Sequence, residues 1–198
     1  MKHLTKKIQV SLEEIADGVS RKEKELEWYA KVDNLNEIIS MSVGFEDQEQ
    51  YGVPSIVNGK MLGSVRCRKT ISKEGTTSYV QTIKVKTQTD RDEAGLPVTK
   101  DIFEMFKALS DQGLIKRRYF IPVKTTDNQS LVFEVDTFQN TQSDECWVKI
   151  DLEIQDNPDI SIPNIPFSCL ELIPGNTQLE DERAKIGYLY NNVFTVKK

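Results

Sequence analysis

Short segments in which charged residues alternate with apolar ones recur along this chain, and they limit what it can fold into. In Phe133-Glu134-Val135-Asp136 two acids alternate with two hydrophobic residues. Because successive side chains of a strand point to opposite faces, such a segment puts its charges on one face and its apolar groups on the other. The pattern therefore predicts half-buried antiparallel strands. Pairs of charged residues two positions apart occur in six segments, and the residue between them is apolar in every pair except Lys116 and Arg118. The pairs are Glu25 and Glu27, Arg66 and Arg68, Lys84 and Lys86, Lys116 and Arg118, Glu134 and Asp136, and Asp151 and Glu153.

The charges of these pairs are sorted by sign, three pairs being basic and three acidic. A solvated strand face explains any one pair, but such a face usually mixes the two signs. Like charges stacked on one face of a sheet repel each other unless a counter-charge is present. The basic pairs therefore indicate a polyanion, and the acidic pairs a divalent cation. Carboxylate oxygens without His or Cys suit Mg²⁺ or Mn²⁺.

The rest of the chain adds a few helices to these strands, so we expect an α+β fold. Helices are predicted at 34–43, 99–112 and 177–190, the last opening with the capping-box spacing of Thr177 and Glu180. The polar stretch 44–63 reads as a loop. If the sheet closes into a barrel with its apolar side chains outward, its interior becomes a charged tunnel. We expect an N-terminal lead-in over 1–22 and a single domain over 23–198.

Composition excludes several classes of function. The one histidine, His3, leaves no Ser-His-Asp triad and no His-rich zinc site. The three cysteines are widely spaced and fit reduced thiols of a cytoplasmic protein. No apolar run is long enough for a membrane helix, and the net charge of −5 disfavours duplex DNA as a partner. That charge is uneven, since residues 60–124 carry 14 Lys and Arg against 7 Asp and Glu, and the remainder 12 against 24.

The order of the motifs resembles the CYTH superfamily, or triphosphate tunnel metalloenzymes, over roughly residues 23–155. The matching segments, in chain order, are Glu25-Leu26-Glu27, Val65-Arg66-Cys67-Arg68-Lys69, Thr82-Ile83-Lys84, Arg91-Asp92-Glu93, Lys116-Arg117-Arg118-Tyr119, Glu134-Val135-Asp136-Thr137-Phe138 and Asp151-Leu152-Glu153. The resemblance implies an eight-stranded antiparallel β-barrel with flanking helices, whose tunnel binds a triphosphate together with Mg²⁺ or Mn²⁺.

The resemblance also implies roles for individual residues. Metal ligands are expected at Glu25, Glu27, Asp136, Asp151 and Glu153. Catalytic roles are expected at Glu25, Glu27, Glu134 and Lys84, with Glu134 orienting the attacking water. Substrate-binding roles are expected at Arg66, Arg68, Lys84, Lys86, Arg91, Lys116 and Arg118.

One departure from the family pattern keeps more than one function open. The family has Lys at the position of Tyr29, although Lys149 enters the same face from a later strand. The first hypothesis is a metal-dependent hydrolase of inorganic triphosphate, a nucleoside triphosphate or an RNA 5′-triphosphate. The second is a non-catalytic binder or sensor of nucleotides, polyphosphate or RNA 5′ ends, which Tyr29 favours. The third is an adenylyl cyclase of class IV type. We expect a monomer or homodimer that contacts neither membrane nor duplex DNA.

Overall fold

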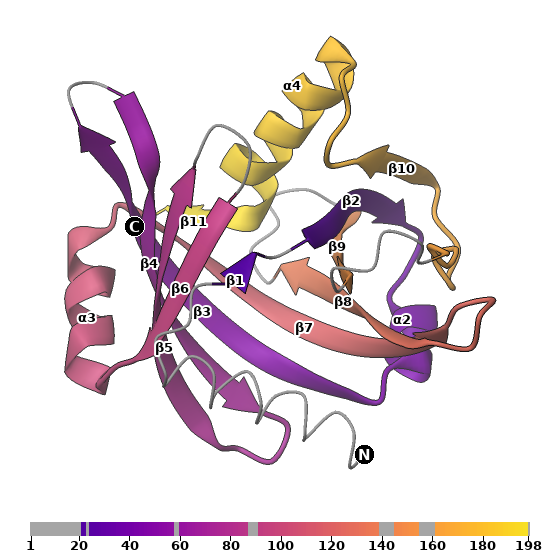
Figure 1. Cartoon of the computed structure of the whole chain (residues 1–198), viewed down its shortest axis with the longest axis horizontal. Coiled ribbons are helices and arrows are strands. Elements are labelled where there is room, and N and C mark those ends of the chain that lie inside the picture. Colours follow the sequence, from indigo (N-terminus) through magenta and orange to yellow (C-terminus); the bar gives the residue numbers. More distant parts are fainter. Residues whose placement is uncertain are drawn as a thin grey trace. The chain divides into compact units, whose positions relative to one another are not determined.

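The fold is described from a computed structural model, for residues 21–22, 24–57, 60–86, 91–138, 145–154 and 161–197 (Figure 1). The chain divides into two compact units. Of the described residues, the first unit contains 21–22, 48–57, 60–86, 91–113 and Lys197, and the second contains 24–47, 114–138, 145–154 and 161–196. The lead-in predicted over 1–22 lies almost wholly outside the described residues.

The described residues of the first unit form a sheet with a helix packed on it. Its strands, in sheet order, are β1 (Arg21–Lys22), β6 (Arg91–Pro97), β5 (Thr77–Lys86), β4 (Lys60–Ser72) and β3 (Gly44–Val57), of which β3 begins in the second unit. The pairs β1–β6, β6–β5 and β5–β4 are antiparallel. Helix α3 (Lys100–Leu109) packs on β4 and β5, where Phe103 contacts a core of Tyr51 and Cys67. The helix ends earlier than the predicted range 99–112, at Leu109, which is 73% exposed.

The second unit has its own antiparallel series of strands. In sheet order they are β7 (Gln112–Lys124, beginning in the first unit), β8 (Ser130–Phe138), β9 (Cys146–Ile154), β2 (Lys24–Val32) and β10 (Glu171–Pro174), and β11 (Thr195–Lys197) pairs with β7. Its helices are α2 (Asn36–Met41) and α4 (Glu180–Tyr188), and α4 continues as the π-helix η1 (Leu189–Phe194).

The predicted alternation is confirmed in this second sheet. Ala30, Val135 and Ile150 are fully buried on one face, where Ile38 of α2 packs against them. The acidic pairs of β2, β8 and β9 occupy the other face, as the pairing register requires. At one end of that charged face, Tyr29 and Trp147 pack with Leu189 and Phe194 of η1.

Some expectations change. The antiparallel sheet and flanking helices of an α+β fold are confirmed, but neither strand series closes on itself among the described residues, so the eight-stranded barrel stays a prediction. The loop predicted over 44–63 is wrong, since most of that stretch is strand β3. Its polar side chains find partners in the folded unit, as Glu49 does in Tyr51 and Lys107. Thr177 bonds Glu182 instead of Glu180, because α4 begins at Glu180 and places Glu182 within reach.

Candidate functional site

The charged side chains of the second unit lie in rows that cross neighbouring strands. In one row Asp151 of β9 is opposite Glu27 of β2 and Glu134 of β8. In the next row Lys149 is opposite Tyr29 and Asp136, and Asp136 is in turn opposite Arg118 of β7. Directly opposed residues of an antiparallel pair share a face and can interact. The register therefore brings together acids and bases that lie more than a hundred residues apart in sequence.

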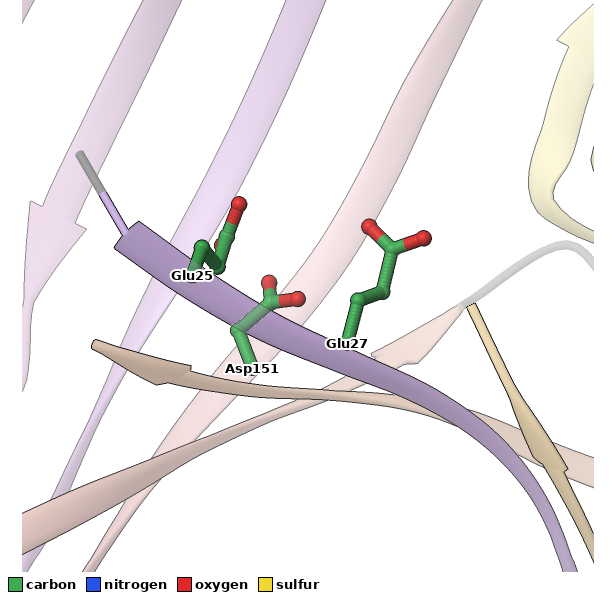
Figure 2. Close-up of side chains that lie close together, drawn as sticks. All are labelled: Glu25, Glu27 and Asp151. Atoms are coloured by element: carbon green, nitrogen blue, oxygen red, sulfur yellow. The ribbon is translucent and has the colours of Figure 1, made fainter. Parts of the chain in front are cut away.

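A cluster of three carboxylates is the centre of this face. One carboxylate oxygen from each of Glu25, Glu27 and Asp151 lies within 4.8 Å of the other two. Figure 2 shows the three side chains extending to the same side, two from β2 and one from β9. Asp151 is 1% exposed, whereas Glu25 is exposed. Oxygen ligands at this spacing fit a hard divalent cation such as Mg²⁺ or Mn²⁺.

The two other predicted metal ligands lie outside this cluster. Glu153 is an exposed residue of β9 opposite Glu25. Asp136 is fully buried and pairs with Lys116 and with Arg118. Three of the five predicted ligands thus lie together in the described structure. Asp136 instead forms ion pairs with Lys116 and Arg118.

Tyr29 holds one oxygen of Glu27. Its buried hydroxyl donates a hydrogen bond to Oε1 of Glu27, and its oxygen lies 3.0 Å from the hydroxyl oxygen of Tyr190. Burial, with the negative charge that ionised Tyr190 and Glu27 would add, raises the pKa of Tyr29 well above its usual range. Tyr29 therefore acts as a neutral donor that orients the Glu27 carboxylate.

Lys149 holds the other oxygen of Glu27. Its Nζ lies 2.8 Å from Glu27 Oε2 and also pairs with Oδ1 of Asp151. Burial alone would lower the pKa of Lys149, but the carboxylates of Asp151 and Glu27 raise it above its usual value. A protonated ammonium thus lies between two of the three clustered carboxylates.

Arg118 organises the neighbouring row. Its Nε and Nη2 are 2.7 and 2.8 Å from the two oxygens of Asp136, a bidentate arrangement, and its Nη1 pairs with Glu134. Its Nη2 is also 3.3 Å from Oδ2 of Asp151. The guanidinium therefore links three carboxylates on β8 and β9 and fixes their spacing.

Burial and charge perturb the pKa values in this network. Burial would raise the pKa of Asp136, but Arg118 and Lys116 hold it below its usual range. Burial, followed by the charge of Arg118, lowers the pKa of Lys116 to about 7. Burial raises the pKa of Glu134, although Arg118 opposes that rise. Of the two acids Asp136 and Glu134, Glu134 is therefore the one whose pKa is raised.

The predicted phosphate-binding residues of the first unit lie on its central strands. Arg66 and Arg68 of β4 are opposite Thr82 and Val80 of β5, while Cys67 between them is buried on the α3 side. Lys84 and Lys86 of β5 and Arg91 of β6 hold register positions in the same sheet, and their side chains lie outside the described part of the chain. The phosphate-binding role of these five residues stays a prediction.

Three residues that complete the site were assigned no role in it from the sequence, although Lys149 was placed on the same face. Lys149 is signalled by its place in the alternation of β9, two residues before Asp151. Gly175 follows β10 and donates its N–H to the carbonyl of Glu27 at 2.7 Å, and a Cβ there would lie 2.8 Å from Glu27 Oε1. The Pro174-Gly175 turn is a sequence signal for a break in the chain, but nothing local connects it to Glu27. Tyr190 has no local signal, because η1 brings it to Tyr29 through tertiary folding.

This arrangement can bind a cation and, beside it, oxyanions. The three acidic pairs supply six carboxylates, and among the described contacts of the unit their cations are Lys116, Arg118 and Lys149. No helix in the described ranges is long and apolar enough to cross a bilayer.

Comparison with known proteins adds little to this description. No family model and no curated protein matches the chain. A structure described as the hypothetical protein NE1496 matches with 16% identity and a TM-score of 0.42, covering 82% of this chain and 96% of its own. A structure described as the inorganic triphosphatase NE1496 matches with 19% identity and a TM-score of 0.39, covering 66% of this chain and 74% of its own. Similarity at this level does not carry an inference about activity, which depends on the residues themselves.

Proposed function

We propose that this chain is a divalent-metal-dependent triphosphate hydrolase. The observation that carries the proposal is the cluster of Glu25, Glu27 and Asp151, with carboxylate oxygens within 4.8 Å of one another beside buried cations. A charged face of this kind is costly to leave uncompensated and attracts a metal ion together with a phosphate chain. The order of motifs that resembles the triphosphate tunnel metalloenzymes supports the same reaction class.

The proposal assigns metal binding to the carboxylates of the cluster and positioning roles to the residues that contact them. Glu25, Glu27 and Asp151 would hold Mg²⁺ or Mn²⁺, with Glu153 and Asp136 as the further acids of the set. The bound cation would supply electrostatic stabilisation of charge on the phosphoryl oxygens. Tyr29 and Gly175 position Glu27, and Arg118 positions Asp136 and Glu134.

The reaction itself is the hydrolysis of one phosphoanhydride bond. A water oxygen attacks the terminal phosphorus, the bond from that phosphorus to the bridging oxygen breaks, and Glu134 accepts the proton of the water. The two products are orthophosphate and the remaining phosphate chain. No covalent nucleophile is needed, because phosphoryl transfer depends mainly on positioning and charge stabilisation.

The substrate class is defined by its triphosphate. Inorganic triphosphate, a nucleoside triphosphate and an RNA 5′-triphosphate all present the same anhydride and a similar charge. Lys116 and Arg118 of the second unit are proposed to bind its phosphates. A cytoplasmic location is proposed with this function.

The test is a phosphate-release assay on all three substrate types, with Mg²⁺, with Mn²⁺ and without metal. We expect orthophosphate release from at least one substrate in the presence of metal. Glu27→Gln should lower it by at least about a hundredfold, because it removes a ligand charge while keeping the shape. The matched control is Glu145→Gln, which removes an exposed carboxylate paired with Lys31 outside the cluster and should leave release unchanged. Absence of release from every substrate with either metal would contradict the proposal.

A second candidate is a binder that leaves its ligand intact. The specific observation in its favour is Tyr29, a neutral buried side chain where the family pattern has a lysine. A binder would retain inorganic triphosphate in equilibrium dialysis with metal, and chromatography would recover it unhydrolysed. Orthophosphate release in the assay described above would favour the hydrolase over the binder.

A further inference from the structure

Building on the proposed function, we propose that Lys149 is an internal counter-cation that couples metal binding to phosphate binding. In the ligand-free protein its ammonium holds Glu27 and Asp151. When a divalent cation takes these carboxylates, the ammonium turns to the phosphate oxygens beside them. Lys149 would thus be a positioning residue for the empty site and a substrate-binding residue for the loaded one.

The contacts of Lys149 place it where a metal would compete with it. Its Nζ pairs with Oε2 of Glu27 at 2.8 Å and with Oδ1 of Asp151. Both carboxylates belong to the cluster whose oxygens lie within 4.8 Å of one another. The Lys149 side chain is 13% exposed, so little water screens its charge. An ammonium and a divalent cation on the same oxygens repel each other strongly at this distance.

Lys149 is expected to leave as a cation, without losing its proton. The ordinary pKa of a lysine is about 10.4, so its ammonium is protonated at neutral pH when it lies beside water or a phosphate. Its charge therefore persists after displacement and needs a new anionic partner. A phosphate chain bound beside the metal supplies such a partner.

The other cations of this face are less free to move. Arg118 is held by both oxygens of Asp136 and by Glu134, and Lys116 is held by the same buried Asp136. A planar guanidinium in a bidentate pair is fixed, whereas an ammonium on a four-carbon chain is a mobile point charge. Lys149 is therefore the cation of this network best suited to exchange partners.

The consequence is reciprocal coupling between the two ligands. Metal binding frees the Lys149 ammonium to contact phosphate. The contact with phosphate replaces the ion pairs that Lys149 loses when the metal binds Glu27 and Asp151. By linkage, phosphate should tighten metal binding by the same factor by which metal tightens phosphate binding.

The experiment measures Mn²⁺ affinity of the full chain by titration calorimetry, in phosphate-free buffer and in saturating inorganic phosphate. Lys149→Met keeps most of the side-chain length and removes the competing charge. We expect it to bind Mn²⁺ about tenfold more tightly than the native protein without phosphate. Phosphate should tighten Mn²⁺ binding clearly in the native protein and several-fold less in the variant.

A second variant and a control keep the test decisive. Lys149→Gln retains a hydrogen-bond donor toward the two carboxylates and is measured in the same way if Lys149→Met does not fold. Lys31→Met removes a lysine of β2 that pairs with the exposed Glu145, and it should leave both affinities unchanged. Thermal unfolding with and without Mn²⁺ gives a second readout, in which the metal should raise the Tm of the Lys149 variants more than that of the native protein.

The outcomes separate this inference from the function on which it rests. If neither the native protein nor the variants bind Mn²⁺, the proposed function fails. If Mn²⁺ binds but the Lys149 variants bind it no more tightly, or lose none of the phosphate effect, the role of Lys149 is overturned and the hydrolase proposal stands. An equal shift in Lys31→Met would also overturn it, because the effect would then be general electrostatics.

Discussion

Tyr29 and Lys149 lie directly opposite each other on β2 and β9, and each holds a different oxygen of the same carboxylate, that of Glu27. A neutral hydroxyl and a cation thus fix the orientation of one candidate metal ligand. The positive charge beside Glu27 therefore enters from the neighbouring strand β9.

The hydroxyl of Tyr29 is expected to matter more for metal binding than for packing. Tyr29→Phe keeps the ring, which stacks on Phe194, and removes the hydrogen bond to Glu27. We expect a loss of about 1 to 2 kcal/mol in the free energy of unfolding and weaker Mn²⁺ binding, because Glu27 loses one of the contacts that orient it. Tyr190→Phe leaves the bond from Tyr29 to Glu27 in place and should weaken Mn²⁺ binding less. Equal Mn²⁺ affinity in Tyr29→Phe and the native protein, by calorimetry, would show that the hydroxyl does not position Glu27.

We expect that only glycine at position 175 allows Glu27 to keep its place in the carboxylate cluster. A Cβ at this position would lie 2.8 Å from Oε1 and 2.9 Å from Cβ of Glu27, so Gly175→Ala must displace the root of that side chain. We expect Mn²⁺ affinity to fall by about tenfold or more, since ligand placement decides affinity. The matched control is Gly187→Ala in α4, where a Cβ meets no atom within 4 Å and alanine favours the helix. Unchanged Mn²⁺ affinity in Gly175→Ala would mean that the cluster tolerates movement of Glu27.

Two adjacent arginines of β7 should differ sharply in their contribution to stability. Arg118→Met leaves the fully buried Asp136 without its bidentate partner and is expected to cost about 3 kcal/mol or more. Arg117→Met removes a half-exposed pair with Asp47 and a contact over the ring of Phe45, and should cost less, about 1 kcal/mol. Urea denaturation measures both, and similar losses for the two variants would contradict a special role for the buried network.

The first unit contains an acid whose pairing should make stability depend on pH. Burial would raise the pKa of Glu49, but Lys107 and Tyr51 lower it below the ordinary value of 4.5. Because the folded-state pKa is the lower one, this stabilisation is present above about pH 4.5 and is lost as the pH falls through the folded-state pKa. Lys107→Met should therefore lower stability at neutral pH and flatten its decline in acid.

Denaturant unfolding between pH 3 and pH 7 measures this effect. Lys124→Met is a suitable comparison, since the Lys124 ammonium donates a hydrogen bond to the side-chain oxygen of Asn128. A pH profile of Lys107→Met that runs parallel to that of the native protein would contradict the assignment.

Much of the candidate site could be predicted from residue order, because period-2 alternation fixes which side chains share a face. Glu25, Glu27 and Asp151 were predicted as metal ligands on that basis together with the family resemblance, and the register brings them together. The loop prediction for 44–63 was wrong because a run of polar residues is typical of an exposed loop. In the fold most of this run is strand β3, and its Glu49 accepts a hydrogen bond from Lys107 of α3. The part played by Gly175 could not be predicted, since its effect comes from contact with a residue about 150 positions away.

The amino-acid sequence by itself determined the charged and apolar faces of the strands, the sorting of charge by sign, and the absence of histidine chemistry. These properties follow from residue type and a fixed strand period. Only the tertiary structure decided that Asp136 anchors Arg118 and Lys116, and that Lys149 lies between Glu27 and Asp151. The reason is physical: alternation determines the face of a strand, whereas register and long-range pairing determine which charges on that face neutralise one another.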